Sequence, residues 1–101
     1  IIREEIFGPV LPLVVFDELD QAIEYANDSD FGLTSSIFTN NLKTAMRACN
    51  EIKFGETMIN RDNMEVFQSF HAGLRKSGIG GADGKHGLYE YMQTHAVYMR
   101  S

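Results

Sequence analysis

The fold is decided by residues 33–60, LTSSIFTNNLKTAMRACNEIKFGETMIN, in which two β-like stretches flank a helical one. Residues 33–39 are rich in β-branched and aromatic side chains, which predicts a strand. Asn40 is expected to cap the helix that follows, in which the apolar residues recur at helical spacing: Leu42, Ala45, Met46 and Cys49. Residues 56–60 predict another short strand. A strand, a helix and a second strand in this order predict a right-handed crossover within a parallel sheet.

The same pattern extends upstream of this stretch. Residues 10–16, VLPLVVF, lack alternation and therefore predict a strand that is covered on both faces. Asp17 can cap a helix over residues 18–27, which carries the apolar stripe Leu19, Ala22, Ile23 and Ala26. The expected fold class is therefore α/β, with a βαβαβ parallel half-sheet.

Downstream of the half-sheet, residues 61–84 form a long irregular stretch with several glycines. A loop of this length in a small domain is unusual unless it forms a site. Open parallel sheets bind ligands beyond the carboxyl ends of their strands, which here means near residues 39–40 and just after Asn60. A short helix over residues 84–93 and a C-terminal strand over residues 94–99 are expected to follow the loop.

The composition is that of one soluble domain: 101 residues, of which 44% are apolar and 23% charged. The net charge is −5, and residues 1–30 hold eight acidic residues and one basic residue, which disfavours nucleic acid as a partner. A single cysteine excludes an internal disulfide and favours the reducing cytoplasm. The longest apolar run, residues 9–16, is far too short to span a membrane, so no membrane association is expected. Because Ile1 opens a sequence typical of the middle of a protein, we expect the chain to be part of a longer one.

The glycine-rich loop matches neither of the common phosphate-binding motifs. After Gly78 and Gly80, the third glycine position of the dinucleotide fingerprint is occupied by Asp83. The phosphate-loop motif fails because Lys85 is followed by His86 rather than by serine or threonine. A turn-rich loop that uses glycine for its backbone freedom is the simpler interpretation.

Cysteine and histidine chemistry has little support in the spacing. Cys49 lies on the apolar face of its predicted helix, where a thiol packs as a small hydrophobic group. The histidines His71, His86 and His95 lack the spacing of a zinc site, so no metal is expected. His71 alone lies in the long loop, where it either lines a ligand pocket or is simply solvated.

Residues 5–9, EIFGP, combine a carboxylate, an aromatic ring and a fixed turn. The carboxylate of Glu5 is able to accept two hydrogen bonds from sugar hydroxyls while the ring of Phe7 packs on a heterocycle. Composition alone favours the alternative that Glu4 and Glu5 are solvated charges.

Ordered blocks along the whole chain resemble the aldehyde dehydrogenase family. The blocks are residues 4–10 (EEIFGPV), 26–28 (AND), 31–33 (FGL), 37–39 (IFT), 59–60 (IN) and 76–80 (KSGIG). This resemblance implies that residues 1–93 are the C-terminal part of the family's Rossmann-like catalytic domain. It also implies that residues 94–101 are the terminal strand of the oligomerisation region, through which the protein forms a homo-oligomer.

The resemblance further implies roles for individual residues. Glu5 would hydrogen-bond the nicotinamide ribose of NAD, and Phe7 would pack beside the nicotinamide. Asn60 would close the last strand leading to the substrate tunnel. The family's nucleophilic cysteine, general-base glutamate and dinucleotide-binding domain lie upstream, and Cys49 matches none of them. We therefore expect NAD to be bound mainly by that upstream domain, and the 101-residue chain to be inactive by itself.

One departure from the family pattern points to a substrate class. Most members read Pro-Phe-Gly-Gly where residues 70–73 read FHAG, so His71 replaces an apolar aromatic residue of the tunnel. Counting back places Glu65 at another tunnel-lining position. Two polar groups suit a small hydroxylated aldehyde, because an apolar substrate would leave them unpaired. Residues 70–91 resemble in particular the branch that oxidises lactaldehyde and glycolaldehyde.

Two other interpretations stay open at this point. In one, the chain serves as a non-catalytic α/β assembly or interaction module. It is also compatible with part of a semialdehyde dehydrogenase, in which Arg75 would anchor a charged substrate.

Overall fold

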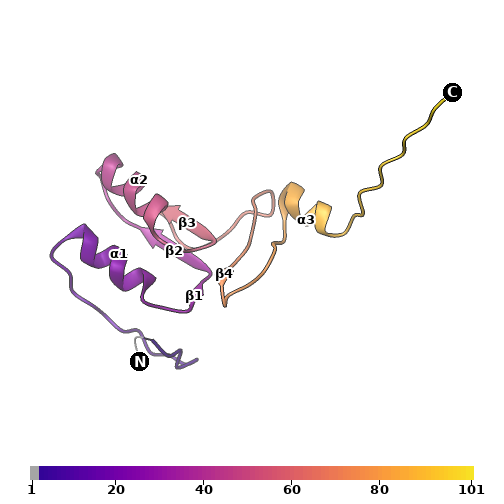
Figure 1. Ribbon diagram of the computed structural model, residues 1–101. Helices are drawn as coiled ribbons and strands as arrows, with labels where there is room; N and C mark the ends of the chain where they lie inside the picture. The colour runs from indigo at the N-terminus through magenta and orange to yellow at the C-terminus, as the bar shows by residue number, and fades with distance from the viewer. Residues whose placement is uncertain (1–2) are drawn as a thin grey trace.

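The centre of the molecule is a pair of parallel strands, β2 (Thr34–Ile37) and β3 (Glu56–Ile59), in a computed structural model that describes residues 3–101. Thr34 lies opposite Glu56, and Ile37 lies opposite Ile59. The chain between the two strands forms α2 (Leu42–Glu51), which lies beside them (Figure 1). The strand, helix and parallel strand predicted from residues 33–60 are thus confirmed.

The other helix of this half is α1 (Leu19–Asn27), which packs beside α2 (Figure 1). Its predicted stripe faces inward: Ile23 is buried, and Leu19, Ala22 and Ala26 are half-buried. The N-cap is Glu18 rather than the predicted Asp17, so the helix starts one residue later than predicted. The side chain of Gln21 closes this end, since its Oε1 accepts hydrogen bonds from the backbone N–H groups of Asp17 and Glu18 at 2.9 and 3.2 Å.

Two details of α2 differ from the prediction. The cap is Asn41 rather than Asn40: its Oδ1 accepts from the backbone N–H groups of Lys43 and Thr44 at 2.9 and 3.2 Å. The buried residues are Ala45 and Ala48. Met46 and Leu42, which were expected on the inner face, are 51 and 75% exposed. Small alanine side chains let the helix approach its neighbours closely, and the longer side chains remain outside.

The strand predicted over residues 10–16 does not form. This segment runs extended beside the body of the molecule, and Leu11, Leu13 and Val15 are 82, 85 and 89% exposed. A strand requires a hydrogen-bonded neighbour, and none lies alongside it within residues 3–101. The βαβαβ half-sheet is therefore reduced to one βαβ unit.

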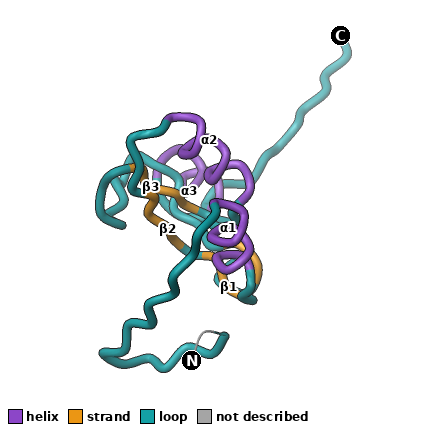
Figure 2. Tube along the Cα trace, turned by 90° about the vertical axis from the view of Figure 1, so that its left-hand side faces the viewer, coloured by secondary structure: helices purple, strands orange, loops and turns teal. Residues whose placement is uncertain are grey.

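The predicted C-terminal strand over residues 94–99 does not form either, for the same reason. Residues 92–101 extend away from the body as an arm, which makes the molecule 69 Å long (Figures 1 and 2). The helix before the arm, α3 (Gly84–Glu90), ends three residues short of the predicted position 93. Among the described residues, no helix is long and apolar enough to cross a membrane.

An antiparallel pair joins two short segments that lie far apart in the sequence. β1 (Phe31–Gly32) pairs with β4 (Leu74–Arg75), which lies inside the stretch expected to be irregular. Gly32 is required at this crossing, because a Cβ there would lie 2.2 Å from the carbonyl oxygen of Lys53. The hydroxyl oxygen of Ser77 accepts a hydrogen bond from Gly32 N at 2.8 Å and fixes the return of the loop.

The core of the described part is small. Its buried apolar residues are Ile23, Ala45, Ala48 and Ala72, and no large side chain is fully buried. Many large apolar side chains are instead exposed along residues 10–16 and 92–99. The local elements are thus held mainly by backbone pairing and polar contacts.

Candidate functional site

The carboxyl ends of β2 and β3 meet at Asn60, at the edge where a ligand was expected. The Asn60 side chain accepts from Thr39 N and donates to Thr39 O, both at 2.9 Å. Asn60 therefore closes this edge, and the chain leaves the sheet beyond it into the long loop. The geometry agrees with the predicted place of Asn60 at the end of the last strand.

An open hollow of about 470 Å³ lies beside β3 and the first part of the loop. It is lined by Gly55, Glu56, Thr57, Met58, Ile59, Arg61, Met64, Glu65, Val66, Ser69 and Phe70. The predicted substrate residue Glu65 is therefore in the wall of this hollow. The guanidinium of Arg61 donates to the carbonyl oxygen of Met64 at 2.6 Å and shapes the loop that carries Glu65.

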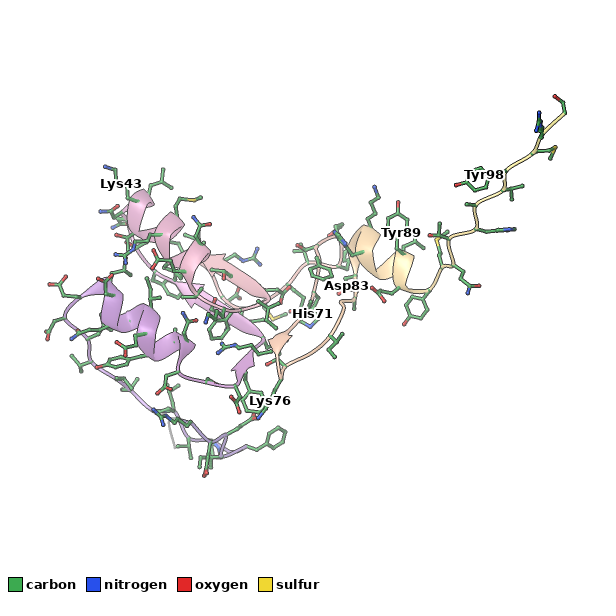
Figure 3. All side chains as sticks on the ribbon, in the orientation of Figure 1. Lys43, His71, Lys76, Asp83, Tyr89 and Tyr98 are labelled. Carbon is green, nitrogen blue, oxygen red and sulfur yellow. The ribbon has the colours of Figure 1, made fainter. Side chains whose placement is uncertain are left out.

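His71, the other predicted substrate residue, is connected to this hollow through Glu56. Its Nδ1 lies 2.9 Å from Oε2 of Glu56, a residue that lines the hollow and is only 8% exposed. The side chain of His71 is 33% exposed and lies in the region between the strands and α3 (Figure 3). Glu56 was not among the predicted site residues, although an acidic residue at the start of an expected strand of the sheet is a signal that it has a polar partner.

The acidic surroundings change the titration of His71. The hydrogen bond to Glu56 raises the pKa of the His71 imidazole, the charge of Glu56 raises it further, and Glu65 and Asp83 add to the effect. Partial burial opposes these contributions but does not cancel them. The direct contact of His71 is therefore Glu56, whereas Glu65 acts on it only through a smaller effect of its charge.

The predicted cofactor residues line a different groove. Glu5 and Phe7 face a volume of about 740 Å³ between the N-terminal segment and the start of β1 and β2. Phe54 and Ser77 contribute to its far wall. The ring of Phe7 is 92% exposed, and its backbone is in the left-handed region with φ 51°. Glu5 and Phe7 thus line one hollow, Glu65 lines another, and His71 reaches the second hollow only through its contact with Glu56.

Arg75, the anchor required by the semialdehyde alternative, is occupied elsewhere. Its guanidinium donates to the carbonyl oxygens of Asn27 at 3.1 Å and Lys53 at 3.0 Å, and also to that of Ser29. It also lies over the ring of Phe54, 5.8 Å from the ring centroid. These contacts give Arg75 a structural role in joining β4 to the end of α1 and to the segment before β3.

The chain belongs to the aldehyde dehydrogenase family, whose sequence model matches residues 1–97. It is 67% identical over its full length to the lactaldehyde dehydrogenase of Escherichia coli K12, of which it covers 21%. A crystal structure of lactaldehyde dehydrogenase from Escherichia coli superposes with a TM-score of 0.93 at 68% identity, over 98% of this chain and 21% of that one. The family resemblance drawn from the sequence blocks is thereby confirmed.

A more distant structure extends the comparison to a cofactor complex. The betaine aldehyde dehydrogenase of Staphylococcus aureus, crystallised with NAD+, superposes with a TM-score of 0.84 at 39% identity. The match covers 88% of this chain and 18% of that one. The chain thus spans about a fifth of the length of the relatives it matches.

Proposed function

We propose that this chain is part of an enzyme that oxidises small hydroxyaldehydes, such as lactaldehyde or glycolaldehyde, to carboxylates with NAD. The observation that carries the proposal is the hollow beside β3, in which Glu65 lines the wall and Glu56 holds His71 at 2.9 Å. The similarity to lactaldehyde dehydrogenase supports it independently.

The proposed recognition follows from hydrogen-bond chemistry. A substrate hydroxyl has one proton to donate and lone pairs that accept. It donates to the Glu65 carboxylate and accepts from the imidazole of His71, so both protein groups are satisfied. An alkyl aldehyde leaves these groups without a partner, which costs binding energy in the transition state.

The groove at Glu5 and Phe7 fits the nicotinamide riboside half of NAD. A carboxylate beside a freely exposed aromatic ring matches a sugar with two hydroxyls attached to a flat heterocycle. Glu5 would accept the ribose hydroxyl hydrogen bonds, and Phe7 would pack beside the nicotinamide. When bound, the nicotinamide supplies the acceptor for a hydride. Most other cofactor contacts belong to the upstream domain in this proposal.

The remaining parts of the chain have an assembly role in this proposal. Residues 1–93 complete the catalytic domain, and residues 94–101 pair with a neighbouring subunit of a homo-oligomer in the cytoplasm. The support is the extended arm, whose backbone has no strand beside it within the described residues (Figure 2).

The function is tested by following NAD reduction with the full-length protein that carries this segment. Lactaldehyde, glycolaldehyde, succinic semialdehyde and propanal are the substrates, and the 101-residue chain is assayed alongside. We expect the hydroxyaldehydes to be preferred and the chain alone to be silent. A full-length protein without activity on any of these aldehydes would favour the assembly-module alternative. A preference for succinic semialdehyde would favour the semialdehyde dehydrogenase alternative.

His71→Phe tests the polar recognition directly. The variant is expected to lower kcat/KM for lactaldehyde relative to propanal by about tenfold, because it removes one hydrogen bond to the substrate hydroxyl. Propanal is the internal control, since it differs from lactaldehyde only by that hydroxyl. An unchanged ratio of the two kcat/KM values would show that His71 does not recognise the substrate hydroxyl.

A further inference from the structure

We infer that Glu56 is a positioning residue for substrate selection: by holding the imidazole of His71 in one orientation, it sets the preference for aldehydes with a 2-hydroxyl group. The inference rests on the proposed function and deepens it. Glu56 acts through His71, and its own role is to fix which ring atom is free for the substrate.

The first support is the rigidity of Glu56 itself. It is the first residue of β3, and its backbone N–H donates to the carbonyl oxygen of Leu33 at 3.1 Å. Its side chain is 7% exposed. A buried carboxylate needs a hydrogen-bonding partner, and the imidazole of His71 supplies one at 2.9 Å.

The second support is the close backbone contact between β3 and the loop at this point. A Cβ on Gly55 would lie 1.6 Å from the carbonyl oxygen of Ala72, so a side chain has no room there. Ala72 is itself 7% exposed. Glu56 directly follows Gly55, and His71 directly precedes Ala72. The side chains of Glu56 and His71 are therefore held at a short, fixed distance from each other.

The third support is that His71 is also held from the other side. Its backbone forms a two-way bridge with Ala82, with N–H to carbonyl distances of 3.0 and 2.8 Å. The neighbouring ring of Phe70 packs against His86 with the ring centroids 4.8 Å apart. The backbone of His71 is thus fixed, and the hydrogen bond to Glu56 fixes the remaining rotation of the ring.

This arrangement defines the chemistry of the free ring atom. With Nδ1–H donating to Glu56, Nε2 is the atom left for a substrate. Nε2 is an acceptor in the neutral ring and a donor in the protonated ring. A charge-assisted hydrogen bond is stronger than a neutral one, so selectivity for the hydroxyl is greater when His71 is protonated.

The charged groups around His71 extend the protonated state to higher pH. They are Glu56 from β3, Glu65 from the loop after β3, and Asp83 at the start of α3, and all of them raise the pKa of His71. In the wild-type enzyme the preference for a hydroxyaldehyde should therefore be high at acidic pH and fall as the pH rises through the raised pKa.

The test is the ratio of kcat/KM for lactaldehyde to that for propanal, measured across pH in the full-length enzyme. Glu56→Gln keeps the shape of the side chain and removes its charge. We expect the inflection of the plot of this ratio against pH to move to lower pH. We also expect the ratio at neutral pH to fall by about tenfold. Glu51→Gln is the matched control, because it removes the carboxylate of an exposed ion pair with Arg47 on α2. It should leave both readouts unchanged.

A second variant covers the case in which Glu56→Gln does not fold. Glu56→Asp retains the charge but shortens the side chain, so the inflection should stay nearer its wild-type position while the preference falls. Glu56→Gln with an unchanged ratio and inflection, or Glu56→Asp with an unchanged ratio, would overturn the inference. A wild-type enzyme that shows no preference for lactaldehyde would instead overturn the proposed function.

Discussion

Asn41 has a role that its neighbour Asn40 does not share. Both are asparagines before α2, and either type of residue can cap a helix. The structure selects Asn41, whose side-chain oxygen accepts from two backbone N–H groups of the first turn. Asn40 is exposed. The sequence therefore predicts the presence of a cap, and only the backbone path into the helix determines its position.

Asn41→Ala is expected to lower the free energy of unfolding by about 1 kcal/mol, because it leaves the capped N–H groups of Lys43 and Thr44 without their partner. Urea unfolding followed by circular dichroism measures the change. Asn40→Ala is the matched control and should leave the midpoint nearly unchanged. Equal effects of the two substitutions would contradict the assignment of the cap.

At the scale of elements, helices and the parallel unit were predictable, whereas the β1–β4 pair was not. The helices and the parallel strands have periodic or β-rich sequences that are visible within ten residues. β1 and β4 have two residues each and lie more than forty positions apart. Their pairing depends on long-range contacts that no local pattern indicates.

An ion pair links the segments that flank β1 and β4. Lys76 Nζ lies 2.5 Å from the carboxylate of Asp30, and Lys76 N donates to Asp30 O at 2.9 Å. Lys76, through this hydrogen bond and its charge, holds the pKa of Asp30 below its ordinary value. A carboxyl with a lowered pKa in the folded state stabilises the fold above its ordinary pKa and loses that contribution as the pH falls through the lowered value.

The β1–β4 pair should therefore become more labile as the pH falls from the ordinary pKa of an aspartate through the lowered pKa of Asp30, where this carboxylate takes up a proton. The effect is small because both side chains are exposed. Amide hydrogen exchange at Lys76, corrected for the intrinsic pH dependence, measures it. In the Asp30→Asn variant, the acid-dependent increase in exchange at Lys76 should vanish. If the increase persisted, it would arise from the titration of another group.

At the scale of the whole molecule, the dominant feature is apolar surface without cover. Residues 10–16 present Leu11, Leu13 and Val15 almost fully to solvent. Contiguous apolar surface of this kind marks an interface or an aggregation site. The relatives are about five times longer than this chain. The surface therefore fits the proposal that further parts of a longer protein cover it.

The isolated chain is expected to self-associate and to bind a hydrophobic dye, and Leu13→Lys should reduce both. Sedimentation at several concentrations and dye fluorescence measure the two effects. Met46→Lys is the control, because Met46 is an exposed apolar residue on α2, outside this segment. If both variants behaved alike, the association would not depend on residues 10–16.

The sequence by itself determined the family, the two amphipathic helices and the strand–helix–strand unit, because these depend on local periodicity and on ordered blocks of residues. It also directed attention to Glu65 and His71. Only the tertiary structure decided that Glu56 is the partner of His71 and that Arg75 binds carbonyl groups. It also decided that residues 10–16 and 94–99 have no strand partner within residues 3–101. The physical reason is that hydrogen bonds and strand pairs between distant residues depend on where the whole chain places them, and not on their neighbours in the sequence.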